Sequence, residues 1–433
     1  MYLYRTLRFK KGGNMEKLYI LKNRTFLSFF IASLITMFGE GIFSLASIVI
    51  ISKSTGSVMS IGYMLIVTML PSVFLAPIVG VVIDRFNKAK IAVACNLARF
   101  LFIAMVPLLS YLGISSLFVV YASIFLSYIV WYILGPTAES MIKVMLEKDQ
   151  YMQGTSLTQA SWQVGLMSSA ILAGLLLKHL GTNFTLLFTS LVYLLGAFLY
   201  FRLCKHYEEE QHVSAKNTGY QNYFKDITVG WKYFIKNKGL LCLGLAACVA
   251  TPFFSSINIL IAPFNSNILH GNEFTLGLID SAAGIGSFIS VAFCLWLSAR
   301  NGSAYYLMLS FLMLGGFTIL FSTSSRYSEA FILYIIIGFF VGNVKVLSKS
   351  LVYKYVDQLF VGRVMTLISM LGLILGIVAS IAIGYLGERN IVQAYYAVGI
   401  CLAIPIVLTA LGILSIKKQG EGSEGDEIVI SKV

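Results

Sequence analysis

Long apolar stretches separated by short polar ones run through most of this chain. Twelve of them are long enough to cross a bilayer core of about 30 Å, which takes roughly 20 residues of helix. Glycines and prolines inside several stretches are typical of membrane helices. The pattern therefore predicts an all-α membrane protein with twelve transmembrane helices, at residues 26–50, 58–83, 89–111, 115–137, 156–179, 183–203, 239–264, 274–299, 303–323, 328–350, 364–387 and 391–415.

Basic residues gather on one side of the expected membrane. The chain has 32 Lys and Arg residues. All but five lie in the terminal segments or in and beside the loops that follow even-numbered helices. Arg99 lies within a helix, and the other four follow odd-numbered helices: Lys53, Lys178, Arg326 and Arg389. Because cytoplasmic loops are enriched in Lys and Arg, we expect both chain ends in the cytoplasm.

The longest polar stretch, residues 204–238, divides the expected helices into two groups of six. It predicts an N-terminal bundle over 26–203 and a C-terminal bundle over 239–415, with cytoplasmic tails at 1–25 and 416–433. Residues 226–238 mix aromatic residues with lysines, which favours an amphipathic helix on the inner leaflet. Two six-helix groups joined by a cytoplasmic linker are typical of transporters built from structural repeats.

The first fourteen residues allow two interpretations. Codons for Lys10 to Gly13 can spell a ribosome-binding sequence just ahead of Met15, so residues 1–14 are either a gene-model artefact or an ordinary basic tail.

Composition excludes several other classes of protein. The chain is 58% hydrophobic and 12% charged, about half the charged fraction of a soluble protein. Its formal charge of +13 sits in clusters between apolar runs, so we expect no nucleic-acid partner. The six cysteines and four histidines lack disulfide or metal-site spacing, and no ATP-binding P-loop is present. We therefore expect no enzyme, catalytic residues, metal or cofactor.

Three charged residues fall inside expected helices, where a charge costs about 2.5–3.5 kcal/mol on insertion scales and so needs a partner or a cavity. Glu40, Arg99 and Asp280 are the candidates for coupling transport to protons or another ion. Each has a structural alternative, because Arg99 and Glu40 can form a buried ion pair and Asp280 can be wetted near the outer surface. Lys345 and Lys349 are expected to reach the inner membrane surface as anchors.

Polar residues also follow one face of the helix expected at 156–179. Gln159 and Gln163 lie one turn apart, beside Trp162, and should face a central cavity or a neighbouring helix rather than lipid. In the seventh helix, Pro252 and Asn258 predict a broken, polar segment near a gate.

The loop after the second helix carries the most specific motif. Gly80, Asp84, Arg85 and Lys88 form a G-x-x-x-D-R-x-x-K pattern at its cytoplasmic end. This pattern resembles the signature loop of the major facilitator superfamily. The resemblance implies two six-helix bundles and a loop that acts as a conformational latch, together with Arg363 at the start of the eleventh helix.

Further motifs resemble the macrolide-efflux and siderophore-exporter branch of that family. They are Phe38–Phe43, Thr55–Ser57, Leu70–Ser72, Leu97–Arg99, Gly135–Thr137 and Val361–Val364. The resemblance implies proton-coupled efflux of an amphipathic drug, macrolide or siderophore by a monomer in the bacterial plasma membrane. The antiporter motif of the fifth helix lacks its proline here, and the arginine of the fourth helix is missing, so coupling rests on analogy. The alternatives are lipid or lysophospholipid flipping and a receptor-like protein that does not transport.

Overall fold

The computed structural model describes residues 23–146, 150–207, 231–297, 303–357 and 360–430. Its helices in the first half are α1 Arg24–Thr55, α2 Val58–Arg85, α3 Lys88–Tyr111, α4 Leu117–Met145 and α5 Tyr151–Tyr207. The second half contains α7 Lys238–Cys248, α8 Ala250–Asn267, α9 Glu273–Leu297, α10 Ser303–Ser322, α11 Tyr327–Tyr355, α12 Val361–Arg389, α13 Ile391–Cys401 and α14 Ala403–Ile430. The prediction of an all-helical membrane protein is confirmed.

Ten helical segments of the described residues are long and apolar enough to cross a membrane. One of them, Leu157–Cys204, has 48 residues, and Gly181 interrupts it with a φ of 77° that favours glycine. This kink lies between the fifth and sixth expected helices, so α5 contains both crossings. α2 has 28 residues but only a shorter apolar part, Val58–Ser72, among the searched residues. Counting α2 and the second crossing of α5, the described residues contain twelve crossings.

Side-chain caps fix where several of these helices begin. The amide oxygen of Asn23 accepts hydrogen bonds from the backbone N–H groups of Thr25 and Phe26 at the start of α1. Ser57 and Asn87 cap α2 and α3 in the same way. These caps satisfy backbone donors that a helix leaves unpaired at its first turn.

Two crossings are broken shortly before a proline. α7 ends at Cys248 and α8 begins at Ala250, just ahead of Pro252, while α13 and α14 divide at Leu402, just ahead of Pro405. Proline lacks the N–H group that would donate to the carbonyl four residues earlier, so each break follows from the sequence. The break near Pro252 agrees with the expected interruption of the seventh helix.

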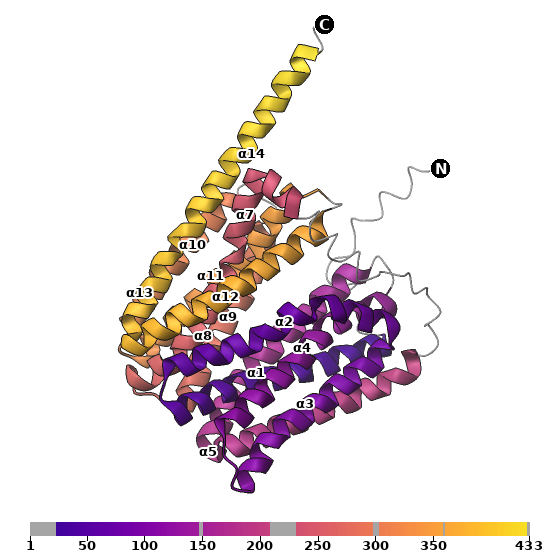
Figure 1. Ribbon diagram of the computed structural model, residues 1–433, viewed down its shortest axis with the longest axis vertical. Coiled ribbons are helices and arrows are strands. Elements are labelled where there is room, and N and C mark those ends of the chain that lie inside the picture. Colours follow the sequence, from indigo (N-terminus) through magenta and orange to yellow (C-terminus); the bar gives the residue numbers. More distant parts are fainter. Residues whose placement is uncertain (1–22, 147–149, 208–230, 298–302, 358–359, 431–433) are drawn as a thin grey trace.

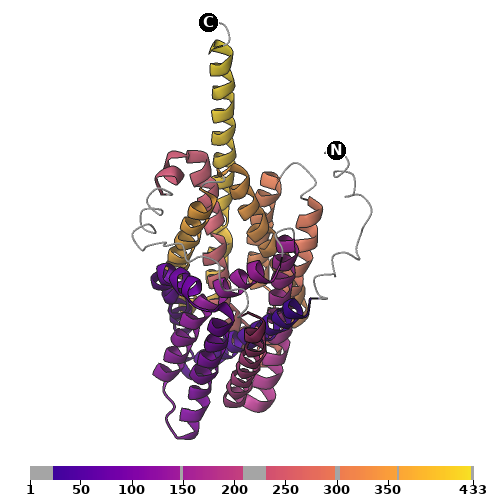
Figure 2. The same cartoon turned by 90° about the vertical axis from the view of Figure 1, so that its right-hand side faces the viewer.

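Figures 1 and 2 show the helices as two groups, the first coloured from indigo to pink and the second from rose through orange to yellow, with α14 extending beyond the second group. Within the first group, α1 and α3 pack against α5; within the second, α11 packs against α9 and α10. The groups meet where α2 packs on α12 and α5 on α9. α14 continues to Ile430, past the predicted end at residue 415.

The predicted amphipathic segment at 226–238 lies partly outside the described residues. Residues 231–236 are helical, and the buried Phe234 ring packs against Gly244 of α7. Tyr233 stacks on Phe360, with ring centroids 4.2 Å apart. This segment is therefore attached to the second half.

Candidate functional site

A buried charge cluster lies inside the first half. Glu40 is midway along α1, and Arg99 of α3 donates a hydrogen bond from Nη2 to its carboxylate oxygen Oε2. The hydroxyl of Tyr193, from the second crossing of α5, donates to the same oxygen at 3.2 Å. Arg99 is completely buried and Glu40 is 7% exposed. The structure therefore brings two of the three expected coupling residues into one ion pair.

Aromatic rings surround the Arg99 guanidinium. Its central carbon lies 4.3 Å from the ring centroid of Tyr193, 5.2 Å from that of Trp131 and 5.8 Å from that of Phe43. Cation–π attraction adds to the ion pair in such a site. Among the described residues, Nε and Nη1 of Arg99 have no hydrogen-bond partner. Because these buried donors are unpaired, the stability of the cluster depends strongly on the charges of Arg99 and Glu40.

Two further hydrogen bonds extend this cluster along α1. Ser33 pairs with Tyr200 at 3.1 Å, and Thr36 donates to the amide oxygen of Asn96 at 3.2 Å. Ser33, Thr36 and Glu40 follow each other at helical spacing, so they lie on one face of α1. A small pocket beside this face is lined by residues of the first half, Trp162 among them. Trp162 thus lies within the first bundle.

Asp280 lies apart from this cluster, on α9 of the second half. It is partly exposed, and the structure gives its carboxylate no hydrogen bond within the described residues. Tyr334 of α11 is within electrostatic range of it. Gly277 and Gly284 lie one turn before and one turn after Asp280 on the same face of α9, and both pack against α5. Asp280 therefore lies close to the boundary between the halves.

The halves are joined at one end of the molecule, which we term the closed end: the C-terminal end of α1, the start of α2, the start of α9 and the end of α12. Glu388 of α12 accepts hydrogen bonds from the Ser57 hydroxyl and from the Met59 backbone N–H, both at 3.1 Å. Its negative charge thereby sits at the N-terminus of α2, where the helix dipole favours it. Lys53 of α1 forms an ion pair with Glu273 of α9.

Glycines allow the backbones to approach closely at the closed end. A Cβ on Gly277 of α9 would lie 2.4 Å from the carbonyl oxygen of Ala170 and 3.2 Å from Cα of Gly174. A Cβ on Gly62 of α2 would lie 2.9 Å from the carbonyl oxygen of Ser380. Side chains larger than hydrogen would therefore separate the halves.

Exposure increases along α8 away from the closed end. Asn265 and Ile261 are buried, Asn258 is partly exposed and Phe254 is 52% exposed. These residues follow one helix face, so that face leaves its neighbours as it runs toward the opposite end.

Exposure along α5, which packs on α9 near the closed end, increases in the same direction. Gly174 and Ala170 are buried, Gln163 is partly exposed and Gln159 is exposed. Because both helices become exposed away from the closed end, the halves separate toward the opposite end. The two glutamines, with Asn258 of α8, lie where this separation begins.

The predicted latch loop lies at the opposite end. Arg85 is exposed, and Lys88 begins α3. Gly80 and Asp84 belong to α2, and the Asp84 side chain lies outside the described ones. The Arg363 guanidinium lies 5.7 Å from the Phe360 ring of the second half. The latch role of these residues stays a prediction.

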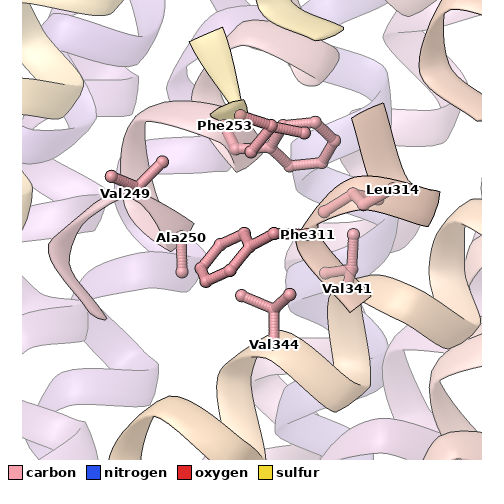
Figure 3. A pocket seen from close by; sticks show the side chains of 8 residues that line it. Val249, Ala250, Phe253, Phe311, Leu314, Val341 and Val344 are labelled. Carbon is pink, nitrogen blue, oxygen red and sulfur yellow. The ribbon is translucent and has the colours of Figure 1, made fainter. Parts of the chain in front are cut away.

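A small apolar pocket lies inside the second half, at the break between α7 and α8. Its lining has no charged or hydrogen-bonding side chain. We interpret it as a packing gap beside the broken helix. Figure 3 shows Val249, Ala250 and Phe253 facing Phe311 and Leu314 of α10 and Val341 and Val344 of α11 across it.

Sequence reasoning missed the residues that join the halves, since Glu388, Lys53 and Glu273 lie at helix ends that read as ordinary loops. The ammonium of Lys345, expected to anchor at the inner membrane surface, lies 4.6 Å from the ring centroid of Phe254 on α8, and its anchoring role stays a prediction. Contacts between residues hundreds of positions apart carry no signal in a single sequence.

The Lys53–Glu273 pair gives a first prediction. Lys53→Glu places two carboxylates together at the closed end, and it should raise the fraction of molecules in which the two halves are separated at that end. Adding Glu273→Lys should return this fraction to the wild-type value. Because the lysine side chain is 59% exposed, we expect a shift of at most about fivefold, corresponding to about 1 kcal/mol. Spin-label distances across the closed end measure this; a swapped pair that behaves like the single variant contradicts it.

Comparison with known proteins identifies relatives of this chain. The family model described as Major Facilitator Superfamily matches residues 29–380. Two uncharacterized MFS-type transporters of Bacillus subtilis (strain 168) are similar in sequence. YkuC is 23% identical over 229 residues, which cover 52% of this chain and 53% of YkuC. YvqJ is 22% identical over 224 residues, with the same coverage of both. The matched part thus spans about half the length of these curated relatives.

Solved structures of several transporters have the same fold. The POT family transporter PepTSo matches with a TM-score of 0.72 at 10% identity, covering 92% of this chain and 98% of that one. The nucleoside transporter NupG matches with a TM-score of 0.69 at 13% identity, covering 91% and 99%. An inward-facing, unoccupied bacterial homologue of the human lysosomal transporter Spinster gives 0.67 at 12%, covering 93% and 96%. At these identities the likeness concerns the fold.

Proposed function

Since the chain belongs to the major facilitator superfamily, and is a multi-pass membrane transporter and not an enzyme, we propose that it exports amphipathic small molecules in exchange for protons. The proposed cargo class is that of drugs, macrolides or siderophores. The proposed site is the space between the halves, bordered by Gln159, Gln163 and Asn258. Alternating access in such a fold proceeds by rocking one bundle against the other about a central site.

We orient the protein in a bacterial cell membrane with the closed end outside. The charge distribution supports this orientation, because the loops at the opposite end carry most of the Lys and Arg residues. The structure then corresponds to an inward-facing state, ready to receive cargo from the cytoplasm. The latch loop at Arg85 would approach the second half when the inner end closes.

One observation carries the proton-coupling proposal: Asp280, a carboxylate within a transmembrane helix at the boundary between the halves, has no hydrogen bond within the described residues. Ionisable groups at such positions mark ion pathways in membrane proteins. A carboxyl group that can lose its proton on one side and regain it on the other provides the exchange. Glu40 differs, because Arg99 already neutralises its charge.

We expect Asp280→Asn to lower gradient-driven export at least tenfold, because an amide cannot carry a proton, while substrate binding persists. Export of a fluorescent amphipathic dye from proteoliposomes with an imposed pH gradient measures the effect. Glu139→Gln, an exposed carboxylate on α4, is the matched control and should export normally. Export by the wild type that continues after the proton gradient collapses contradicts the proposal.

A further inference from the structure

Lys345 is a cation far from the ends of its helix. It lies ten residues before the end of α11 at Tyr355, which places its Cα roughly 15 Å from that end at 1.5 Å per residue. A lysine at this depth is costly in lipid unless it faces water or a partner. Within the described residues it has no ion pair, and its ammonium lies over the Phe254 ring at 4.6 Å. The cation is therefore held by an aromatic face but is not neutralised.

The register of α11 shows where Lys345 points. Gly338, two turns earlier on nearly the same face, packs on Ala283 of α9. Val341 and Val344, to one side, face the interior of the second half. Lys345 lies between these two directions. This face of α11 is buried on α9 at Gly338 and exposed at Lys345, so it becomes open away from the closed end, beside Phe254 of α8.

Phe254 belongs to the boundary as well. It continues the α8 face that holds Asn265, Ile261 and Asn258, whose exposure increases away from the closed end. α8 also packs against α1 and α2 of the first half. Lys345 and Phe254 therefore border the space that opens between the halves.

The described face of α5 that turns to the second half is polar and uncharged beyond its contact with α9. Gln159 and Gln163 are in register with Met167, Ala170 and Gly174, the residues through which α5 meets α9. Their amides can donate and accept hydrogen bonds. A ligand between the halves thus meets a cation and an aromatic ring on one side and amides on the other.

From this arrangement we infer that Lys345 and Phe254 form a subsite for the negatively charged group of the cargo, which is an amphipathic anion with a carboxylate or phosphate. The inference rests on the proposed export function and adds a charge requirement to it. The ammonium would form a charge-assisted hydrogen bond to the anion, and the exposed Phe254 ring would contact the adjoining apolar part. A cationic amphiphile would meet an uncompensated positive charge there.

The test uses the purified full chain in detergent with two probes of the same shape, dansyl-aminoundecanoate and its uncharged amide. Energy transfer from tryptophan to the dansyl group reports binding. We expect the wild type to bind the carboxylate at least tenfold more tightly than the amide. Lys345→Gln should remove that preference and leave amide binding within about twofold, and Lys345→Arg should retain it. Lys354→Gln, an exposed lysine of the same helix, is the matched control and should bind like the wild type.

Equal wild-type affinity for both probes overturns the inference. So does a Lys345→Gln variant whose affinity falls equally for the carboxylate and the amide, because such a loss would indicate a structural role. Competition by lysophosphatidylglycerol separates a lipid source of the anion from a free amphiphile. A protein that prefers the carboxylate probe but does not export it along a proton gradient contradicts the proposed function and leaves the subsite standing.

Discussion

Glu40→Gln is expected to destabilise the protein strongly and to stop transport. The substitution leaves the fully buried Arg99 without its counter-charge, in a site where two of its nitrogens already lack partners among the described residues. Removing one partner of a buried ion pair typically costs about 3–5 kcal/mol. Arg99→Gln should cost a similar amount, because it leaves the Glu40 carboxylate buried with Tyr193 as its donor. Thermal unfolding in detergent measures both variants.

The double variant Glu40→Gln with Arg99→Gln separates stability from transport. Two amides can hydrogen-bond in the space of the ion pair, so the melting temperature should recover most of the loss. If the pair is needed for coupling, export remains at least tenfold below the wild type. A double variant that exports normally shows that the pair is structural. Lys53→Gln serves as the control, since breaking an exposed pair should cost under about 1 kcal/mol.

Gly277→Val is expected to stop transport while each half remains folded. A Cβ at this position would lie 2.4 Å from a backbone carbonyl oxygen of α5, which cannot move aside as a flexible side chain can. The valine should therefore hold α9 away from α5 and keep the closed end from closing. We expect export to fall at least tenfold, because each transport cycle requires this closure.

Accessibility at the closed end measures the same effect directly. Ser281, one turn along α9, is buried. A cysteine there, in a chain with its native cysteines replaced by serine, should react with a membrane-impermeant maleimide in the Gly277→Val background at least tenfold faster than without it. Gly316→Val is the control, since a Cβ there would have nothing within 4 Å. Export at the wild-type rate by Gly277→Val contradicts the assigned role of this contact.

Local features of the fold could be predicted from the sequence. Apolar length placed the crossings, because the bilayer sets the length of a spanning helix. Pro252 predicted the broken seventh helix, because proline lacks the N–H group that would donate a hydrogen bond to the carbonyl four residues earlier. The break at Gly181 falls between the helices expected at 156–179 and 183–203, as predicted. The extension of α14 to Ile430 was not predicted, since it continues helix through polar residues that read as a tail.

The candidate site could be predicted only in part. A charge inside an apolar helix is visible in any sequence, so Glu40, Arg99 and Asp280 were identified, and an ion pair between the first two was one of the two interpretations. The orientation of Lys345 could not be foreseen, because a lysine ten residues from a helix end can equally reach the membrane surface. The contact of Glu388 with Ser57 spans 331 positions and depends on how the halves meet.

The central claim is that the two halves alternate between opening at one end and at the other. Paired spin-label distances test it most directly, with one pair at Ser116 and Ser325 near the closed end and another at Arg85 and Lys354 near the opposite end, all exposed positions. When protonation or bound cargo is varied in lipid nanodiscs, the account predicts that a longer distance in the first pair accompanies a shorter distance in the second. Distances that stay constant in both pairs, or that lengthen together, would contradict it.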